Sequence, residues 1–177
     1  MLDSWGATDA ERTCALPGDD LIEGPALVGS RAIDITADPE VIFDFLAQMG
    51  FNRAGWYSYD LLDNLGRKSA TTIHPEWLVE SAGESVPGGP ITFVAAVVDR
   101  PTAYALHLPQ RHALGYVIDF TLAYRLEATN FGTRLLSRAR LNIDGPAGPM
   151  LSRALLLGDG VMVRRQLLGL KQRCEAV

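Results

Sequence analysis

The stretch GYVIDFTLAYRLE, residues 115–127, decides how the rest of the chain is interpreted. Apolar and polar side chains alternate along it with a period of two, the period of a β-strand. A strand with a single apolar face is typical of an antiparallel sheet that is covered on that face alone. The inward face is expected to carry Tyr116, Ile118, Phe120, Leu122, Tyr124 and Leu126, and the outward face Asp119, Thr121 and Arg125.

Strand patterns continue on both sides of this stretch. ITFVAAVVD (residues 91–99) and TAYALHL (residues 102–108) precede it, and FGTRLLSRARLNI (residues 131–143) follows. The last of these also alternates, with Leu135, Ser137, Ala139, Leu141 and Ile143 on one face. Its other face carries Arg134, Arg138 and Arg140, which we expect to be solvated on the outer surface of the sheet.

The first half of the chain predicts an arm, a strand and two short helices. Residues 1–26 have no sustained periodicity and are interpreted as an N-terminal tail or arm, followed by a single domain over residues 27–177. A strand is predicted over residues 26–37. A helix follows it, with Asp38 as the N-cap, Pro39 at the first helical position and Glu40 near the positive end of the helix dipole. A second short helix lies in GWYSYDLLDNLG, residues 55–66, where an apolar stripe is expected to face the core: Ser58, Leu61, Leu62 and Leu65.

Residues 149–175 predict one long helix at the end of the chain. Leu151, Leu155 and Met162 form one apolar stripe, and Val163, Leu167, Leu170 and Cys174 form another that is rotated about the axis. Paired glycines permit a bend in a helix. We therefore expect a kink at Gly158–Gly160, with different faces buried on either side of it.

Small residues indicate where a pocket lies. A terminal helix that covers the inner face of the sheet would bring Gly158 opposite Ser137 and Ala139. Small residues on both sides of a sheet–helix gap leave volume unfilled, and proteins keep few voids larger than a few water molecules. The sequence therefore predicts an internal cavity.

Composition excludes several classes of function. The 177 residues are 47% hydrophobic, and the formal net charge of −5 argues against a nucleic-acid-binding surface. No apolar run is long enough to span a bilayer, and the first residues do not resemble a secretory signal. The two cysteines, Cys14 and Cys174, do not form a disulfide framework or a metal-ligand pattern. We expect a cytoplasmic protein without a cofactor or a metal.

Four segments of the chain together resemble the SRPBCC superfamily, which includes START lipid-transfer domains, plant allergens and polyketide cyclases. These segments are SRAIDITADPEVIFDFLAQMG, RAGWYSYDLLDNLGR, IHPEWLVESAGESVP and MVRRQLLGLKQR, and they extend from Ser30 to Arg173. GWYSYD is similar to a bacterial branch of the superfamily. The resemblance implies an α+β helix-grip fold, in which a curved antiparallel sheet wraps around a long C-terminal helix and two short helices follow the first strand. It implies a shared cavity and not a shared chemistry.

The candidate ligand-binding residues combine inward strand positions, the terminal helix and an aromatic cluster. Trp56, Tyr57, Tyr59 and Trp77 either line the mouth of the pocket or anchor the short helices. We expect the pocket to be lined by Trp56, Tyr57, Trp77, Phe93, Tyr104, Tyr116, Ile118, Phe120, Ser137, Ala139, Leu155 and Met162.

Charged groups near these residues have structural and functional interpretations. His107 falls on the outward strand face, which favours a surface role over a catalytic one. Asp63 and Arg67 are spaced for a salt bridge along a helix, and Arg53 is either structural or a partner for a ligand carboxylate.

Two functions remain open at this point. The first is binding or carriage of a small hydrophobic molecule, and the second is a cyclase or dehydratase reaction in the same cavity. No residue pattern indicates a nucleophile, so no catalytic residue is assigned and whether the chain is an enzyme stays open. A homodimer is compatible with the sequence.

Overall fold

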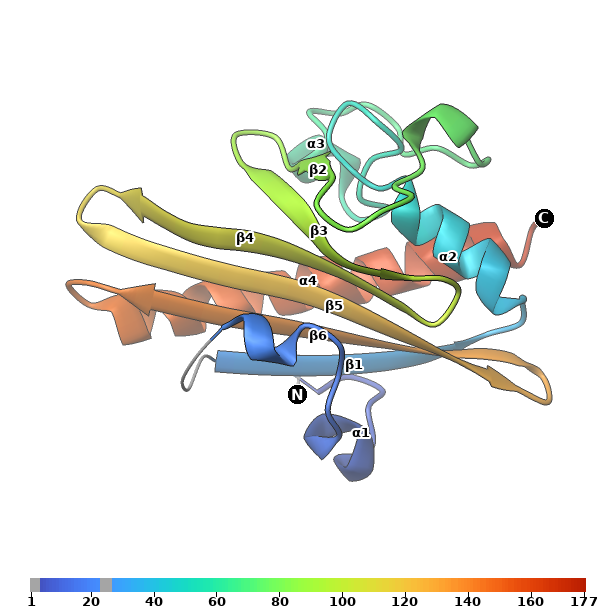
Figure 1. The fold of residues 1–177 in the computed structure, drawn as a ribbon, viewed down its shortest axis with the longest axis horizontal. Coiled ribbons are helices and arrows are strands. Elements are labelled where there is room, and N and C mark those ends of the chain that lie inside the picture. The colour runs from blue at the N-terminus through green and yellow to red at the C-terminus, as the bar shows by residue number, and fades with distance from the viewer. Residues whose placement is uncertain (1–3, 23–26) are drawn as a thin grey trace.

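A single curled sheet organises the computed structural model, which describes residues 4–22 and 27–177. Its six strands are antiparallel to their neighbours and follow the order β1-β6-β5-β4-β3-β2. The long helix α4 runs across the inner face of the sheet (Figure 1). The strands are β1 (Leu27–Ile35), β2 (Ser85–Pro87), β3 (Thr92–Asp99), β4 (Ala103–Ala113), β5 (Tyr116–Thr129) and β6 (Gly132–Asp144). The α-helices are α1 (Asp9–Thr13), α2 (Pro39–Ala47), α3 (Asp60–Asp63) and α4 (Gly148–Cys174), with 3-10 turns η1 (Asp19–Leu21) and η2 (Pro75–Trp77).

This architecture confirms the predicted fold class. The element order of one strand, two short helices, a run of antiparallel strands and a terminal helix is the expected one. The longest strands, β5 and β6, pair at the middle of the sheet, where the alternation in the sequence is clearest. On β5, Leu122 and Tyr124 are buried beneath α4, as the period of two predicts.

Helix α2 packs against the sheet and α4 at one end of the molecule. It begins at Pro39 directly after Asp38, where the sequence predicts a helix start. Ile42, Phe45 and Leu46 are fully buried in the cluster that α4 and the sheet also form. The segment from residue 48 to β2 follows α2 and lies over the same end of the molecule (Figure 1).

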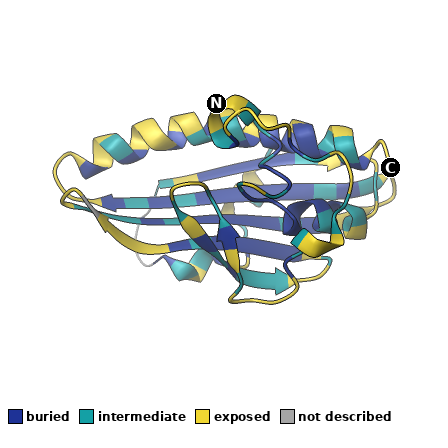
Figure 2. Cartoon of the chain, turned by 90° about the horizontal axis from the view of Figure 1, so that it is seen from above, coloured by how far each residue is buried: buried dark blue, intermediate teal, exposed yellow. Residues whose placement is uncertain are grey.

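Helix α4 differs from the prediction in its first half. It is one continuous helix through Gly158–Gly160, without an interruption at the paired glycines, and the kink expected there stays a prediction. Leu156 is buried in place of its neighbour Leu155, which is 48% exposed. The predicted stripe is therefore wrong by one residue in its first part, where Ser152 and Leu156 are buried instead of Leu151 and Leu155, whereas Met162 lines the pocket. Figure 2 shows the outward side of α4 exposed along much of its length.

The second half of α4 packs as the sequence predicts. Val163, Leu167, Leu170 and Cys174 are all buried against the sheet and α2. Gly169 comes so close to the backbone of Tyr57 that an added Cβ would lie 2.2 Å from its carbonyl oxygen. The helix is thus held tightly at its C-terminal end and more loosely at its N-terminal end.

Residues 6–22 lie against the outer face of the sheet, whereas Trp5 packs against the inner core cluster and Arg164 of α4. Leu16 packs on small residues there, including Ala32, Ala105 and Ala123. Arg138, which we expected in solvent, is 4% exposed because this segment covers it. The interpretation of the outer arginines as a solvated face was therefore wrong. The division into an arm over residues 1–26 and a domain over 27–177 stays a prediction, and residues 1–3 and 23–26 lie outside the described residues.

Candidate functional site

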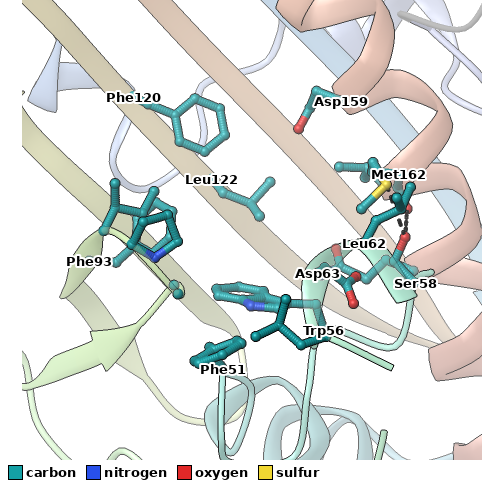
Figure 3. A pocket seen from close by; sticks show the side chains of 17 residues that line it. Phe51, Trp56, Ser58, Leu62, Asp63, Phe93, Phe120, Leu122, Asp159 and Met162 are labelled. Atoms are coloured by element: carbon teal, nitrogen blue, oxygen red, sulfur yellow. Dashed lines mark hydrogen bonds between the residues drawn. The ribbon is translucent and has the colours of Figure 1, made fainter. Parts of the chain in front are cut away.

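A cavity of about 400 Å³ lies between the inner face of the sheet and α4. Its walls come from β3, β5, α4, the segment around α3 and the turn before β3 (Figure 3). The cavity is lined by Phe51, Trp56, Ser58, Leu62, Asp63, Leu65, Gly88, Gly89, Pro90, Ile91, Phe93, Phe120, Leu122, Asp159, Met162, Val163 and Gln166.

Aromatic rings form one wall of this pocket. The ring of Phe93 lies 5.7 Å from that of Trp56 at an interplanar angle of 68°, and 6.2 Å from that of Phe120 at 58°. Edge-on and tilted contacts of this kind are favourable and hold the rings in defined positions. The wall therefore offers a preformed apolar surface to a flat or aliphatic molecule.

An ion pair between α4 and β1 contributes to the pocket wall. Asp159 projects from α4 toward the sheet (Figure 3), and its Oδ2 lies 3.0 Å from Nη1 of the fully buried Arg31 on β1. Burial raises the pKa of Asp159, and the guanidinium of Arg31 opposes this rise. The pair places charged groups next to the apolar walls of the cavity.

The side-chain amide of Gln166, which also lines the pocket, is held in place by hydrogen bonds. The hydroxyl of Tyr124 donates to Oε1 of Gln166 at 2.6 Å, and Nε2 of Gln166 lies 3.4 Å from the sulfur of Met49. Burial raises the pKa of Tyr124 well above its usual value, so this phenol stays protonated at neutral pH. Gln166 thus faces the pocket with its orientation fixed by the core.

Asp63 is the least satisfied polar group in the pocket wall. Its carboxyl oxygens are buried, and within residues 4–22 and 27–177 neither has a well-formed hydrogen-bond partner. Burial, with a smaller contribution from the charge of Asp60, raises the pKa of Asp63 to about 6. The predicted salt bridge to Arg67 does not form, because Arg67 donates instead to Asn52 at 2.6 Å. Asp63 therefore places in the wall of the pocket a buried carboxyl group without a well-formed hydrogen-bond partner among the described residues.

The mouth of the pocket carries exposed leucines. Leu62 and Leu65 line the cavity and yet are 71% and 76% exposed. With Leu61, which is 77% exposed, they were predicted to face the core, and that prediction is wrong. A helix of four residues is too short to turn a whole apolar stripe inward, so these side chains form the rim instead.

The structure brings four of the twelve predicted ligand-binding residues together in this pocket: Trp56, Phe93, Phe120 and Met162. Trp56 comes from the segment before α3 and Met162 from α4 (Figure 3). The sulfur and carbonyl oxygen of Met162 both lie within reach of the Ser58 hydroxyl, at 3.7 and 2.9 Å. This contact ties the α3 segment to α4.

Two predicted aromatic residues have structural roles outside the pocket. Tyr57 is buried, and its hydroxyl accepts a hydrogen bond from the Gln48 amide at 2.8 Å. Trp77 stacks on His74 at a ring distance of 4.2 Å. These two residues anchor the segments around them, whereas Trp56 lines the pocket.

The remaining predicted residues also lie outside the lining. Tyr104, Ser137 and Ala139 are fully buried in the packed core, and Leu155 faces outward. Tyr116 and Ile118 are half-buried at the far end of β5. Tyr124 lies directly opposite Ser137 in the β5–β6 ladder, and so large a side chain fills the space that the small residue leaves.

Sequence reasoning missed the carboxyl groups and the turn before β3. From the sequence, Asp159 was considered only as part of the kink at Gly158–Gly160, and Asp63 only as the partner of Arg67 in a structural salt bridge. A lone acidic residue within an apolar helical stretch was the available signal for Asp159. The turn of Gly88 to Ile91 carried no signal beyond its glycines and prolines.

Other candidate groups lie away from the pocket. His107 lies on the outward face, as predicted, but is half-buried, with Nε2 2.8 Å from Oδ1 of Asp119. In the part of the chain that the structure describes, no cluster of His, Cys, Asp or Glu could hold a metal ion. Cys14 and Cys174 are free. Within the same ranges, no helix is long and apolar enough to cross a membrane.

Comparison with known proteins identifies the fold. No family model and no curated protein matches the sequence. Among solved structures, protein MLL2253 from Mesorhizobium loti is similar to this chain with a TM-score of 0.56 and 14% identity, over 85% of this chain and 98% of that one. Protein CV1439 from Chromobacterium violaceum gives 0.51 and 12%, over 84% and 96%. The Aha1 dimer from Colwellia psychrerythraea gives 0.50 and 15%, also over 84% and 96%.

The chain has the helix-grip fold. Matches of this kind cover most of both chains, and they agree with the curled antiparallel sheet and long C-terminal helix described above. The fold that the sequence resemblance implied is thereby confirmed. Identities of 12–15% establish the fold alone, so the activity has to be argued from the pocket of this chain.

Proposed function

We propose that the chain binds a small, largely apolar molecule in the pocket beneath α4. The observation that carries this proposal is a cavity of about 400 Å³ that stays open beside an otherwise packed core. Protein interiors are close-packed, and sites for small molecules commonly enclose about 300–1,000 Å³. Burial of apolar ligand surface would supply most of the affinity, at about 25 cal/mol per Å².

The polar groups of the pocket restrict the chemistry of that molecule. Asp63, Asp159 and Gln166 present mainly hydrogen-bond acceptors, and the two carboxyl groups disfavour an anionic ligand. A ligand with an apolar body and a hydroxyl or amine group would match the aromatic wall and Asp63 together. The lipid-like, polyketide-like and aromatic metabolites considered from the sequence include molecules of this kind.

Acid–base catalysis on a molecule in the same pocket is the second candidate function. The specific observation in its favour is Asp63, a carboxyl group with a pKa of about 6 and unsatisfied oxygens in an apolar wall. A group that titrates near neutral pH can accept and return a proton, as a cyclisation or dehydration would require. The buried tyrosines and His107 lie outside the lining, and Asp159 in the lining is paired with Arg31, so Asp63 is the group proposed to carry that step.

A titration with Nile red, a neutral dye that fluoresces in apolar surroundings, tests the binding proposal. Met162→Trp places a larger side chain in the pocket wall, whereas Met150→Trp makes the same change at a position on α4 that is 70% exposed. We expect Met162→Trp to weaken dye binding roughly tenfold and Met150→Trp to leave it unchanged. Thermal melting shows whether both variants fold.

Equal dye affinity in the two tryptophan variants would contradict the proposal. The two candidate functions are separated by Asp63→Asn, once a converted substrate is known. Under simple binding, the amide variant keeps its ligand with at most a modest change in affinity. Under acid–base catalysis, it keeps the ligand and loses turnover, because an amide does not exchange a proton at neutral pH.

A further inference from the structure

The rim of the pocket continues into an apolar surface on α4. A shallow hollow on the outward side of α4 is formed by Tyr59, Val161, Arg164, Arg165 and Leu168. A second hollow is lined by Ser58, Tyr59, Asp60, Leu61 and Arg165, so the two share Tyr59 and Arg165. Together they connect the leucines at the mouth of the pocket to the outward side of the helix. We call this the rim surface: Tyr59, Leu61, Leu62, Leu65, Val161, Arg164, Arg165 and Leu168.

The apolar members of the rim surface are unusually exposed. Leu61, Leu62 and Leu65 are 77%, 71% and 76% exposed, and Val161 is 42% exposed. Isolated exposed apolar residues are normal, but a contiguous group beside a pocket marks an interaction site. None of these side chains is needed to fill the core, because the buried face of this part of α4 is supplied by Gly160, Val163 and Gln166.

The charge of this region opposes that of the whole chain. The rim surface carries two basic residues, Arg164 and Arg165, and no acidic one, whereas the chain as a whole has a net charge of −5. The guanidinium of Arg164 also lies 5.3 Å from the ring of Trp5. Asp159 turns inward to Arg31, so it does not neutralise the outward side. Arg67 and Lys68 are exposed directly after the rim leucines. Of the nearby acids, Asp60 accepts hydrogen bonds from Ser69 and Asp63 lines the pocket.

We propose that the rim surface docks on a membrane that contains anionic lipids. Leucines that protrude from a short turn can insert among acyl chains, while adjacent arginines meet the phosphate groups at the interface. Basic side chains at a membrane surface also gain from its negative potential. This combination favours a lipid surface over a protein groove, because Leu61 and Leu62 project from a four-residue helix, Leu65 follows it, and the three do not form the stripe of a longer helix.

Docking would place the mouth of the pocket on the lipid. Leu62 and Leu65 belong both to the pocket lining and to the rim surface, so an apolar molecule could pass between the membrane and the cavity without crossing water. This consequence rests on the proposed binding function. The docking itself does not, and the two are tested separately.

Co-sedimentation with vesicles tests the docking. We expect the protein to bind vesicles made of equal parts phosphatidylcholine and phosphatidylglycerol, to bind poorly to phosphatidylcholine alone, and to be released by added salt. Leu61→Asp and Arg165→Glu change the rim surface at positions outside the pocket lining. Each should reduce the bound fraction, roughly tenfold for the charge reversal. The matched controls Phe131→Asp, at a residue 87% exposed in the β5–β6 turn, and Arg111→Glu, on β4, should bind as the unchanged protein does.

Three results would overturn the docking proposal. The first is absence of binding to the anionic vesicles. The second is an equal loss of binding in the rim and control variants. The third is a dimer in analytical ultracentrifugation that Leu61→Asp dissociates, which would make this surface an interface between two copies of the chain. Nile red binding, measured on the same variants in solution, shows that they fold and distinguishes failure of docking from failure of the pocket.

Discussion

The two faces of the sheet differ in how completely their polar side chains are hydrogen-bonded. On the outer face, Arg138 donates to three backbone carbonyls of the arm, to Asp19 at 2.6 Å and to Ser30 at 3.0 Å. Arg134 likewise forms a hydrogen-bonded ion pair with Glu11, and this contact lowers the pKa of Glu11 to about 2. On the inner face, by contrast, a cavity remains beneath α4 and Asp63 has no well-formed partner among the described residues.

This difference separates a structural surface from a binding surface. A buried charge is stable only when it is paired and hydrogen-bonded, and the outer arginines meet that condition within the chain itself. The arm also covers an edge of the sheet, since the backbone amide of Ala32 on β1 donates to the carbonyl of Trp5 at 3.0 Å. The inner face leaves polar groups and apolar walls for a molecule from outside.

Arg138→Ala should cause the largest loss of stability. It leaves arm carbonyls and the Asp19 carboxylate without their donor in a buried site, and breaking a buried pair in this way costs about 3–5 kcal/mol. Arg12→Ala is the matched control, because among the described residues the side chain of Arg12 pairs with the exposed Asp9 alone, so the change should cost less than about 1 kcal/mol. Urea denaturation measures both. Equal losses would mean that the arm does not seal the outer face.

Two glycines of α4 should respond in opposite directions. In Gly169→Ala the new Cβ would lie 2.2 Å from the carbonyl oxygen of Tyr57, so we expect destabilisation of about 1–3 kcal/mol. In Gly158→Ala no atom beyond the neighbouring residues and backbone of the helix itself lies within 4 Å of the new Cβ, so the gain in helix propensity should stabilise by up to about 1 kcal/mol. Thermal melting compares the two variants. A stabilised Gly169→Ala protein would contradict the tight packing at this end of the helix.

Asp63 should give the smallest effect, visible as a dependence of stability on pH. Its pKa of about 6 in the folded protein lies above the ordinary value, so the folded state binds more protons than the unfolded state in this range. The contribution of Asp63 to stability therefore rises as the pH falls from about 7 to about 5. We expect about 1 kcal/mol, since solvent screens this half-buried side chain.

The control for this pH effect is Asp63→Asn. The difference in unfolding free energy between the two proteins should change across the same pH range, because the amide does not titrate. A difference that is independent of pH would show that Asp63 has an ordinary pKa. It would also remove the specific observation that favours acid–base catalysis in the pocket.

The sheet could be predicted from the sequence because its signal is local. Alternation with a period of two assigns each side chain to a face, and this placed Phe93 and Phe120 on the side that the pocket occupies. The helix start at Asp38 and Pro39 was readable for the same reason, since a few adjacent residues determine it. The resemblance then supplied how these elements are arranged.

The pocket lining was less predictable because it depends on what lies opposite each residue. Ser137 and Ala139 are small, but a void forms only where no large neighbour fills the space, and Tyr124 lies against Ser137. The outer arginines were misjudged because an arm from the start of the chain covers them, over a sequence distance of more than one hundred residues. Such distant pairings leave no periodic pattern in the sequence.

The most direct test of the account is to find which face of the sheet a bound apolar molecule contacts. Amide and indole resonances of isotope-labelled protein can be followed by NMR while Nile red is added. We expect saturable shifts at Trp56, Phe93 and Gln166 and unchanged resonances at Ala123 and Arg138 on the outer face. Saturable shifts confined to the outer face, or the absence of any saturable shift, would contradict the central claim that the cavity beneath α4 is a binding site.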